Sequence, residues 1–511
     1  MMSSTLAFCI VTSTALFIWA YLKSKHKLPS PPGPPALPLV GHLFTIPPSR
    51  QEYFFHELGK TYGDIVHLHI PTRSFIVLNS TQTATDLLEK RSHNYSDRPP
   101  FPIFELMGID KALSTMRYGP RFQLHRKMMQ QYFSRKDCVS YQPIQTRGAR
   151  VLLQNLVSTP EKRDDHLSHY STTLILRISF GHEITSNGDI FLDVLKDAGQ
   201  ILRSSGPPGS TAIDFFPFLQ YFPSWFPGTH YAEVARRARS TVKRVDNFPL
   251  AQVQEQMANG TAKPSFMASN LEAFNNGSNI ASNTIPDIQG AVGVIYAAGA
   301  ETTWSSISIF FLAMVFNPEC QARAQKEIDT VIGSGRLPGF EDRESLPYVE
   351  CLVQETLRWN SPVPLGIPHY SLEDDVYNGM FIPKGSIVIA NTRGMSLDDK
   401  VYSDPLAFNP SRYLPKPVGL GEPRPVAHYG FGRRICPGRY FADASIWIAA
   451  ALVLATMDIS MALDENGKEI IPELEFSTGI TSHPVPFRCN IRPRNEAARS
   501  LIAQADISDN Y

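Results

Sequence analysis

The sequence lacks an excess of charge of either sign, and it contains few cysteines. Lysine plus arginine and aspartate plus glutamate each number 48 in 511 residues, so the formal net charge is zero. This balance excludes the global basic field that attracts nucleic acid, and no nucleic-acid partner is expected. The six cysteines are widely spaced and include no CxxC pair. That spacing argues against a disulfide framework or a structural zinc site and is typical of a reducing compartment.

Internal repeats and nucleotide-binding glycine fingerprints are also absent. Gly419-x-Gly421 and Gly430-x-Gly432 each lack the third glycine of GxGxxG. Apolar residues make up 43% and charged residues 19% of the chain, as in folded globular proteins. The length fits either two or three domains or one large fold. Electrons for any redox chemistry would therefore come from a separate protein.

The N-terminus carries one long apolar run. Residues 5–22 contain no charged side chain, and eighteen helical residues rise about 27 Å, close to the thickness of a bilayer core. Lys23, Lys25 and Lys27 follow directly, so the positive-inside rule places the rest of the chain in the cytosol. The alternative is a cleaved signal peptide, which would have a basic segment before a shorter apolar run. The pattern predicts a single-pass transmembrane anchor.

A proline-rich hinge follows the anchor. Residues 28–36 include five prolines, which form a semi-rigid spacer that cannot continue a helix. We expect this hinge to hold the remaining globular part, residues 37–498, at a set angle to the membrane.

Hydrophobic periodicity predicts a mainly helical first half with some β-structure. Residues 51–62 are amphipathic at helical spacing, and residues 64–70 and 74–79 alternate as in a β-hairpin. Residues 82–258 are mainly helical in pattern. Residues 259–286 are rich in Asn, Ser and Gly, and they predict a surface loop.

The second half contains the strongest helix of the chain, from about residue 286 to 317. It is largely apolar and some 30 residues long, so we expect it to cross the core. Two shorter helices are predicted at about residues 347–360 and 437–456. Short strands are expected at residues 364–392 and near residues 476–491.

One cysteine lies in a segment suited to a flat ligand. In residues 429–438, YGFGRRICPG, Gly430 and Gly432 allow a close backbone approach. Cys436 directly precedes a proline and an apolar helix, whose N-terminal dipole favours a thiolate. Arg434 is placed to pair with a carboxylate of such a ligand. An isolated buried cysteine is usually inert, so the prediction depends on the whole ten-residue arrangement.

This segment resembles the cysteine-ligand loop of the cytochrome P450 family, FxxGxRxCxG. Every fixed position matches except the first, where Tyr429 stands for Phe. The resemblance implies that Cys436 is the axial ligand of the iron of haem b and that Arg434 contacts the haem. Tyr429 would keep the packing under the sulfur, and its phenol would add a hydrogen bond that shifts the potential.

The long helix carries a second motif, AGAETT, at residues 298–303. A carboxylate at Glu301 is costly in an apolar stretch unless it is satisfied or used. Taken alone, the motif also fits a hydrogen-bonded core acid and a Thr302 hydroxyl bonded to the carbonyl four residues earlier. The segment is similar to the P450 pattern [AG]Gx[DE]T[TS]. The resemblance implies a dioxygen groove at Gly299 and a catalytic role for Glu301 and Thr302 in proton delivery.

Glu355 and Arg358 match the ExxR pair of the same family, about 80 residues before the cysteine. Alone, such a pair means little, because surface ion pairs at this spacing are common. Arg412 lies in a segment similar to the family's PERF motif. The resemblance implies that the three residues form a structural triad.

Two further residues are expected to bind the haem propionates by resemblance. Arg126 ends a segment similar to WxxxR, with Phe122 in place of Trp. The hydrogen bond of that Trp would be lost or taken over by His125. His369 lies where the family often places a propionate-binding His or Arg; the alternative is a surface histidine in a strand.

The resemblance covers nearly the whole chain and is to eukaryotic microsomal members of fungal style. It implies a single mainly α domain with a small β region, the triangular helical prism of the P450 fold, preceded by the transmembrane helix. It also implies location at the endoplasmic reticulum, with the catalytic domain facing the cytosol. The implied activity is a haem-thiolate monooxygenase that inserts one oxygen atom of O2 into a C–H or C=C bond of an apolar small molecule. A terpenoid or polyketide of specialised metabolism would fit.

The implied partners are an NADPH–cytochrome P450 reductase and, as a second electron donor, cytochrome b5. Lys127, Arg433 and Arg439 are expected to contribute to the docking surface. The aromatic cluster at residues 215–226 is expected to contact the membrane; the alternative is that it lines the substrate entrance. Two other activities stay open: a haem-thiolate isomerase or dehydratase that needs no O2, and a non-catalytic haem or ligand carrier. The presence of Glu301 and Thr302 favours the monooxygenase.

Overall fold

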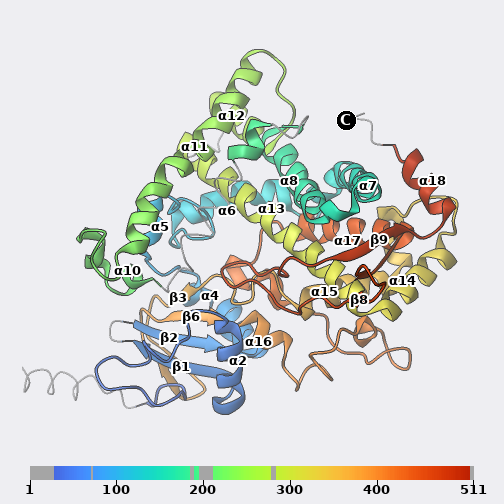
Figure 1. Ribbon diagram of the computed structural model, residues 1–511. Helices are drawn as coiled ribbons and strands as arrows, with labels where there is room; N and C mark the ends of the chain where they lie inside the picture. Colours follow the sequence, from blue (N-terminus) through green and yellow to red (C-terminus); the bar gives the residue numbers. More distant parts are fainter. Residues whose placement is uncertain (1–27, 71–72, 185–188, 195–210, 278–283, 507–511) are drawn as a thin grey trace, which may run out of the picture.

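Helices make up 55% and strands 10% of the residues that the structure describes, which confirms the predicted mainly α architecture with a small β region. The computed structural model describes residues 28–506 except 71–72, 185–188, 195–210 and 278–283. The predicted anchor at residues 5–22 lies outside the described residues. Figure 1 shows a roughly triangular outline, with a sheet at one corner and helices filling the rest.

The largest sheet has the strand order β1-β2-β6-β3. β1 and β2 form the antiparallel hairpin that the sequence predicts, and β2 pairs in parallel with β6. Two small sheets, β4-β5 and β8-β7-β9, complete the β-structure of the described residues. The strands are β1 (Ile65–Ile70), β2 (Arg73–Leu78), β3 (His369–Tyr370), β4 (Asp375–Tyr377), β5 (Met380–Ile382), β6 (Ile387–Ala390), β7 (Met457–Leu463), β8 (Glu469–Ile470) and β9 (Cys489–Pro493).

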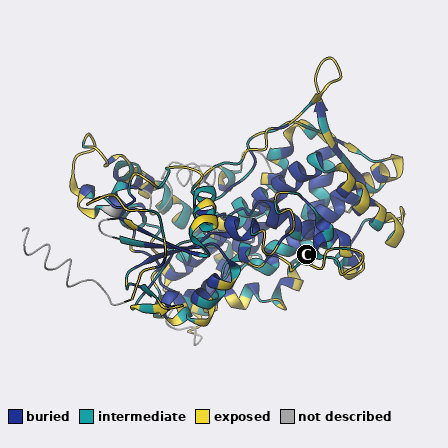
Figure 2. Cartoon of the chain, turned by 90° about the horizontal axis from the view of Figure 1, so that it is seen from below, coloured by how far each residue is buried: buried dark blue, intermediate teal, exposed yellow. Residues whose placement is uncertain are grey.

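The long predicted helix is α13 (Ile285–Phe316). Thr284 caps its first turn in a capping box with Asp287, and the helix ends where Asn317 precedes a proline. It packs along α8 (Arg163–Phe180) and against α17 (Arg439–Thr456). Each large apolar side chain buried at these contacts contributes about 1.5–3 kcal/mol. Figure 2 shows the buried residues concentrated in this helical block.

Two helices of the described residues are long and apolar enough to cross a membrane, namely α13 and α17. Their most apolar windows are 67% and 72% buried inside the protein. They are therefore the core helices that the sequence predicts.

The other helices surround this core. α15 and α17 lie within a residue or two of the predicted bounds, and α2 coincides with them. The helices are α2 (Gln51–Tyr62), α3 (Thr81–Ala84), α4 (Ser92–Tyr95), α5 (Pro102–Met107), α6 (Pro120–Phe133), α7 (Gln142–Ser158), α10 (Ala212–Phe215), α11 (His230–Ala258), α12 (Phe266–Asn275), α14 (Pro318–Val331), α15 (Pro347–Trp359), α16 (Thr392–Ser396) and α18 (Glu496–Gln504).

Two predictions about secondary structure are wrong. The loop expected at residues 259–286 contains helix α12, which Ser265 caps and which buries Phe266 and Leu271 between α8 and α13. The helix forms despite the surrounding Asn and Gly because its apolar residues recur at helical spacing and are stabilised by packing against α8 and α13. Near residues 476–491 a strand begins only at Cys489; before it, Phe476 and Pro484 form an isolated bridge.

Candidate functional site

The loop that carries Cys436 is closed by backbone contacts. The Cys436 N–H donates to Tyr429 O at 2.8 Å, and Gly430 and Gly432 have left-handed φ angles of +75° and +55°. A Cβ on Gly432 would lie 2.1 Å from Leu88 O. The glycine is thus required by packing on the neighbouring π-helical turn at Thr85–Lys90, in addition to the turn itself.

The thiol of Cys436 is half-buried, three residues before α17 begins. Burial raises its pKa, while a hydrogen bond from the Gly438 backbone and the charges of Arg126 and Arg439 act in the opposite direction. The N–H at the start of the helix therefore favours the thiolate, as expected, but desolvation of the buried sulfur outweighs it. A bound metal cation would supply the missing stabilisation of the thiolate.

The phenol of Tyr429 makes no hydrogen bond to any described residue, although its oxygen is buried. Burial is also the largest cause that raises its pKa. The hydrogen bond expected from this phenol is therefore not present in the described part of the protein. The sequence revealed the substitution, but only the packing around it decides whether a partner is in reach.

Arg98, His369 and Arg434 lie buried together, at most 9% exposed, although they are far apart in the chain. Arg434 donates to the carbonyls of residues 96, 113 and 116, and Arg98 to those of residues 114, 367 and 368. The Nδ1–H of His369 donates to Tyr95 O at 2.7 Å. The surface histidine considered for position 369 is therefore wrong.

This cation cluster, Arg98 with His369 and Arg434, has no carboxylate ion-paired to it among the described residues. Asp97 is nearest in sequence, but it pairs with Arg117 at 2.5 Å. Burial lowers the pKa of all three members, and that of Arg434 falls to about 9. Charge repulsion inside the cluster acts in the same direction for Arg98 and His369. An anionic ligand group would relieve both effects.

Arg98 was not predicted as a site residue. Its position between an aspartate and two prolines is typical of an ordinary turn, and nothing local marks it. It enters the cluster through carbonyls some 270 positions away, which a motif search within one segment does not reveal.

Arg126 on α6 reaches the Cys436 loop by donating to Ile435 O. Phe122 is buried, and its ring lies 3.8 Å from the guanidinium carbon of Arg434. The Nε2–H of His125 donates to Asp287 on α13 at 2.9 Å, whereas its buried Nδ1 has no hydrogen-bond partner among the described residues. The replacement of the missing Trp by His125 therefore stays a prediction.

Glu301 and Thr302 are half-buried on α13. The Thr302 hydroxyl donates to Ala298 O at 2.8 Å, which is the local bond left open as an alternative. Glu301 accepts from the Thr481 hydroxyl at 3.5 Å. A Cβ on Gly299 would lie 2.4 Å from the Ile175 side chain on α8, so this glycine allows the close packing of two helices. The dioxygen groove implied for it stays a prediction.

The predicted structural triad is present. The Glu355 carboxylate accepts from Arg358 at 2.7 and 2.8 Å and from Arg412 at 3.0 Å, and all three side chains are fully buried. The Tyr413 hydroxyl donates to the same carboxylate at 2.6 Å, and Glu422 balances the second arginine. Every charge in this cluster is therefore compensated.

The sequence matches the family model "Cytochrome P450" over residues 31–491. The chain belongs to the cytochrome P450 family. It is 39% identical to cytochrome P450 monooxygenase 136 of Postia placenta, over 99% of this chain and 97% of that protein. It is also 39% identical to cytochrome P450 monooxygenase claR of Ampulloclitocybe clavipes, over 96% and 90%. Cytochrome P450 monooxygenase 176 of Postia placenta is 37% identical over 97% of both chains.

The protein is therefore an oxidoreductase of the P450 monooxygenase type. Membership of the family implies a haem-thiolate iron, a redox partner and a small-molecule substrate. The residues fit this cofactor: a thiol lies in a glycine loop, and the buried cations Arg98 and Arg434 have no ion-paired carboxylate in the part of the chain that the structure describes.

Proposed function

We propose that this P450 binds haem b through Cys436 and inserts one oxygen atom of O2 into a C–H or C=C bond of an apolar small molecule. The observation that carries the proposal is the cation cluster behind the Cys436 loop, which lacks a carboxylate partner in the described residues. Arg126, His369 and Arg434 would hold the propionates, and Arg98 would join them. A haem would supply two carboxylates for these cations together with an iron for the thiolate.

When bound, the haem supplies oxygen activation, because a thiolate ligand pushes electron density onto the iron and favours O–O cleavage. Glu301 and Thr302 on α13 would deliver the protons that this reaction consumes. Glu301 would hold a proton on its carboxylate, and the Thr302 hydroxyl, which donates to Ala298 O, would exchange that bond to pass a proton on. This pair favours the monooxygenase over an isomerase, a dehydratase or a carrier, because oxygen activation consumes protons overall, whereas rearrangement, dehydration and ligand binding consume none overall.

The proposed electron source is NADPH, through a separate P450 reductase, with cytochrome b5 as a second donor. A cavity of about 670 Å³ supports this docking function. Arg433 and Arg439 line it, as expected, together with Arg126 and Arg135. Lys127 is exposed on the same helix as Arg126 but does not line the cavity. A basic surface of this kind attracts the acidic face of a partner protein.

The proposed location is the cytosolic face of the endoplasmic reticulum, with residues 5–22 as the single-pass anchor, 28–36 as the hinge and 37–498 as the catalytic domain. Two groups of exposed apolar side chains support membrane contact: Tyr221 and Trp225 are 83% and 79% exposed, and Leu39 and Phe44 are 84% and 77% exposed. Neighbours of both groups pack on the same apolar cluster. Exposed apolar surface of this extent marks an interaction site.

The proposed substrate is an apolar compound of specialised metabolism, such as a terpenoid or polyketide. The apolar side chains of α5 and the residues before it, Phe101, Ile103 and Met107, support this proposal because they form a buried cluster with apolar residues of α10 and α11. Metabolite comparison after deletion of the gene tests the substrate class. An accumulating apolar precursor is expected; accumulation of a polar, charged compound would contradict the proposal.

The reduced, carbon-monoxide difference spectrum tests the ligand. The wild type should show the red-shifted Soret band of thiolate ligation, and Cys436→Ser should lose it. Cys489→Ser is the matched control, since Cys489 is also half-buried but lies on β9 beside Arg163. A wild type without this band, or a band lost in both variants, would overturn the proposal.

A further inference from the structure

Residues 475–485 form a hairpin shortly before the last strand, β9. The Ser477 N–H donates to His483 O at 2.8 Å, and the Val485 N–H donates to Glu475 O at 3.0 Å. The turn that joins the two sides of this hairpin is therefore held in shape by backbone hydrogen bonds. Its contacts with the rest of the protein decide where the side chains of the turn lie.

Ser482 fixes this turn between two helices. Its carbonyl accepts a hydrogen bond from the Ser305 hydroxyl on α13, and its N–H donates to Pro362 O at 2.9 Å, shortly after α15. The side-chain amide of Asn360 donates to the Ser482 hydroxyl at 3.3 Å. Ser305, Asn360 and Ser482 are at most 3% exposed. A buried polar network whose members satisfy one another is rigid, so the turn is held in one place against α13.

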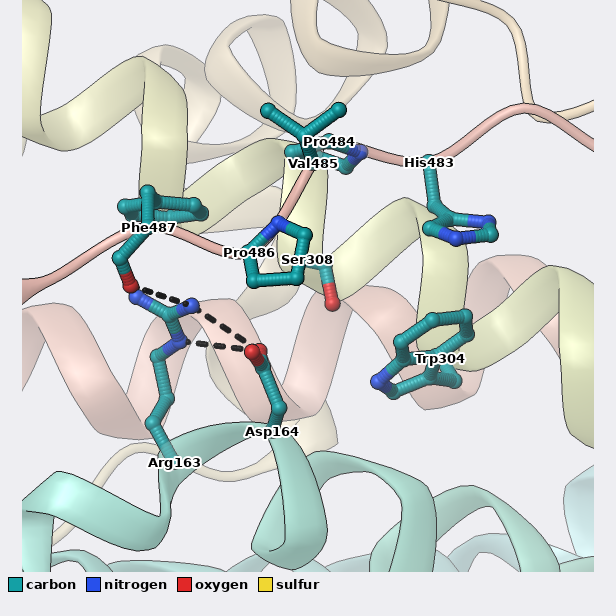
Figure 3. Close-up of a pocket in the computed structure, with 9 residues that line it drawn as sticks. All are labelled: Arg163, Asp164, Trp304, Ser308, His483, Pro484, Val485, Pro486 and Phe487. Carbon is teal, nitrogen blue, oxygen red and sulfur yellow. Dashed lines mark hydrogen bonds and ion pairs between the residues drawn. The ribbon is translucent and has the colours of Figure 1, made fainter. Parts of the chain in front are cut away.

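Figure 3 shows a second attachment, where the chain leaves the turn and crosses α13. The His483 ring lies against that of Trp304, with 4.6 Å between the ring centroids. Farther along, the guanidinium of Arg163 on α8 stacks on the Phe487 ring at 3.7 Å and donates to Phe487 O at 3.2 Å. The hairpin is therefore fixed to α8 and α13 beyond its turn as well as within it.

Thr481, the neighbour of Ser482, contacts Glu301. The Thr481 hydroxyl donates to the Glu301 carboxylate at 3.5 Å, and both residues are half-buried. Glu301 and Ser305 are four positions apart, so they share one face of α13. Because Ser305 holds Ser482, Thr481 is held at the carboxylate of Glu301. A hydrogen bond to a carboxylate reduces the number of rotamers that its long side chain samples.

We propose that Thr481 is a positioning residue of this P450. Its hydroxyl holds the Glu301 carboxylate in one orientation for the reaction, and Ser305 and Ser482 hold Thr481 in place. Thr481 makes and breaks no covalent bond and keeps its own proton. Nothing local in the sequence marks this role, because positions 301 and 481 are 180 residues apart. The inference rests on the proposed function, since the orientation of Glu301 matters to catalysis only if Glu301 delivers protons.

Crystal structures of the haem-loaded wild type, Thr481→Val and Thr481→Ser test the positioning directly. Glu301 should have one conformer in the wild type and in Thr481→Ser, which keeps a hydroxyl, and at least two conformers in Thr481→Val. One conformer in all three proteins would overturn the inference. The result does not depend on turnover, so it can be judged even if the carbon-monoxide spectrum contradicts the proposed function.

The infrared C–O stretch of the reduced carbon-monoxide complex tests the same effect in solution. This frequency shifts with the electric field of nearby charged groups. The wild type and Thr481→Ser should give one band, and Thr481→Val should give a second. In a Glu301→Ala background, Thr481→Val should change nothing further, because its partner is gone. The same change in both backgrounds would show that Thr481 acts without Glu301 and would reject the inference.

Two variants make the same chemical changes elsewhere. Thr456→Val is the control for Thr481→Val: Thr456 is buried near the end of α17, and its hydroxyl donates to Leu452 O at 2.7 Å. Ser308→Ala is the control for Ser305→Ala, since Ser308 is buried on α13 and its hydroxyl has no partner among the described residues. Ser305→Ala should give a weaker second C–O band than Thr481→Val, and the controls should keep one band. A second band in the controls, or none in Ser305→Ala, would reject the arrangement.

Discussion

Two buried charge clusters of this P450 differ in one respect. Around Glu355, two arginines, a tyrosine and a second glutamate balance one another at hydrogen-bond distance. The cluster of Arg98, His369 and Arg434 is also buried, at 5–9% exposure, yet its hydrogen bonds go only to neutral carbonyls among the described residues. Burying an unpaired charge is costly. The first cluster is therefore stabilised by its own charges and has a structural role, whereas the second requires an anionic ligand to balance its charge.

The largest effect is expected when the compensated cluster is broken. Glu355→Ala leaves Arg358 buried without a carboxylate and Arg412 with Glu422 alone, which should lower the free energy of unfolding by about 3–5 kcal/mol. Chemical denaturation measures it. Glu57→Ala is the control: its pair with Lys60 is exposed, and the loss should stay below about 1 kcal/mol. Similar losses in both variants would remove the distinction between these sites.

Changes in the cation cluster should weaken cofactor binding more than folding. His369→Phe and Arg434→Met each remove a donor to a carboxylate, and haem retention should fall roughly 10-fold. Haem content per folded protein, with circular dichroism to confirm the fold, measures the effect. Full haem content in both variants would show that the cluster does not hold the propionates.

The haem-free and haem-loaded proteins should differ in their response to acid. Burial, followed by the charge of Arg98, lowers the pKa of His369 well below its ordinary value. The unfolded chain takes up this proton first as the pH falls, so the haem-free protein should lose stability below about pH 6.5. Bound propionates would compensate the charge and weaken this dependence. Denaturation of both forms of wild type and His369→Phe at several pH values checks it.

The smallest effect on stability is expected when a tyrosine hydroxyl is removed, and this change can be compared at two positions. Tyr413→Phe removes a hydroxyl that donates to Glu355, and it should destabilise the protein by about 1–2 kcal/mol. Tyr429→Phe removes a buried hydroxyl that has no partner among the described residues, so stability should stay equal or rise slightly. Thermal denaturation compares the pair. A loss at Tyr429 equal to that at Tyr413 would reveal an unseen partner, such as water.

Local signals were sufficient for much of the molecule. The cap at Thr284 and the proline after Asn317 delimit α13 within the chain itself, and the hairpin of β1 and β2 follows from alternation around a proline. The motifs around Glu355, Arg412 and Cys436 can also be recognised from a few neighbouring residues. These features depend on contacts between residues close in sequence, or on motifs whose spacing is itself the signal.

The tertiary structure decided what each group touches and whether its charge is compensated. Arg98 joins the cation cluster through distant carbonyls, Gly299 faces Ile175, and Asp287 takes the hydrogen bond of His125. The sequence likewise predicts Cys436 and its place before a helix. The direction of its pKa shift depends on burial, which only the tertiary structure shows. Desolvation is a property of all surrounding elements together, and a linear pattern of residues does not contain it.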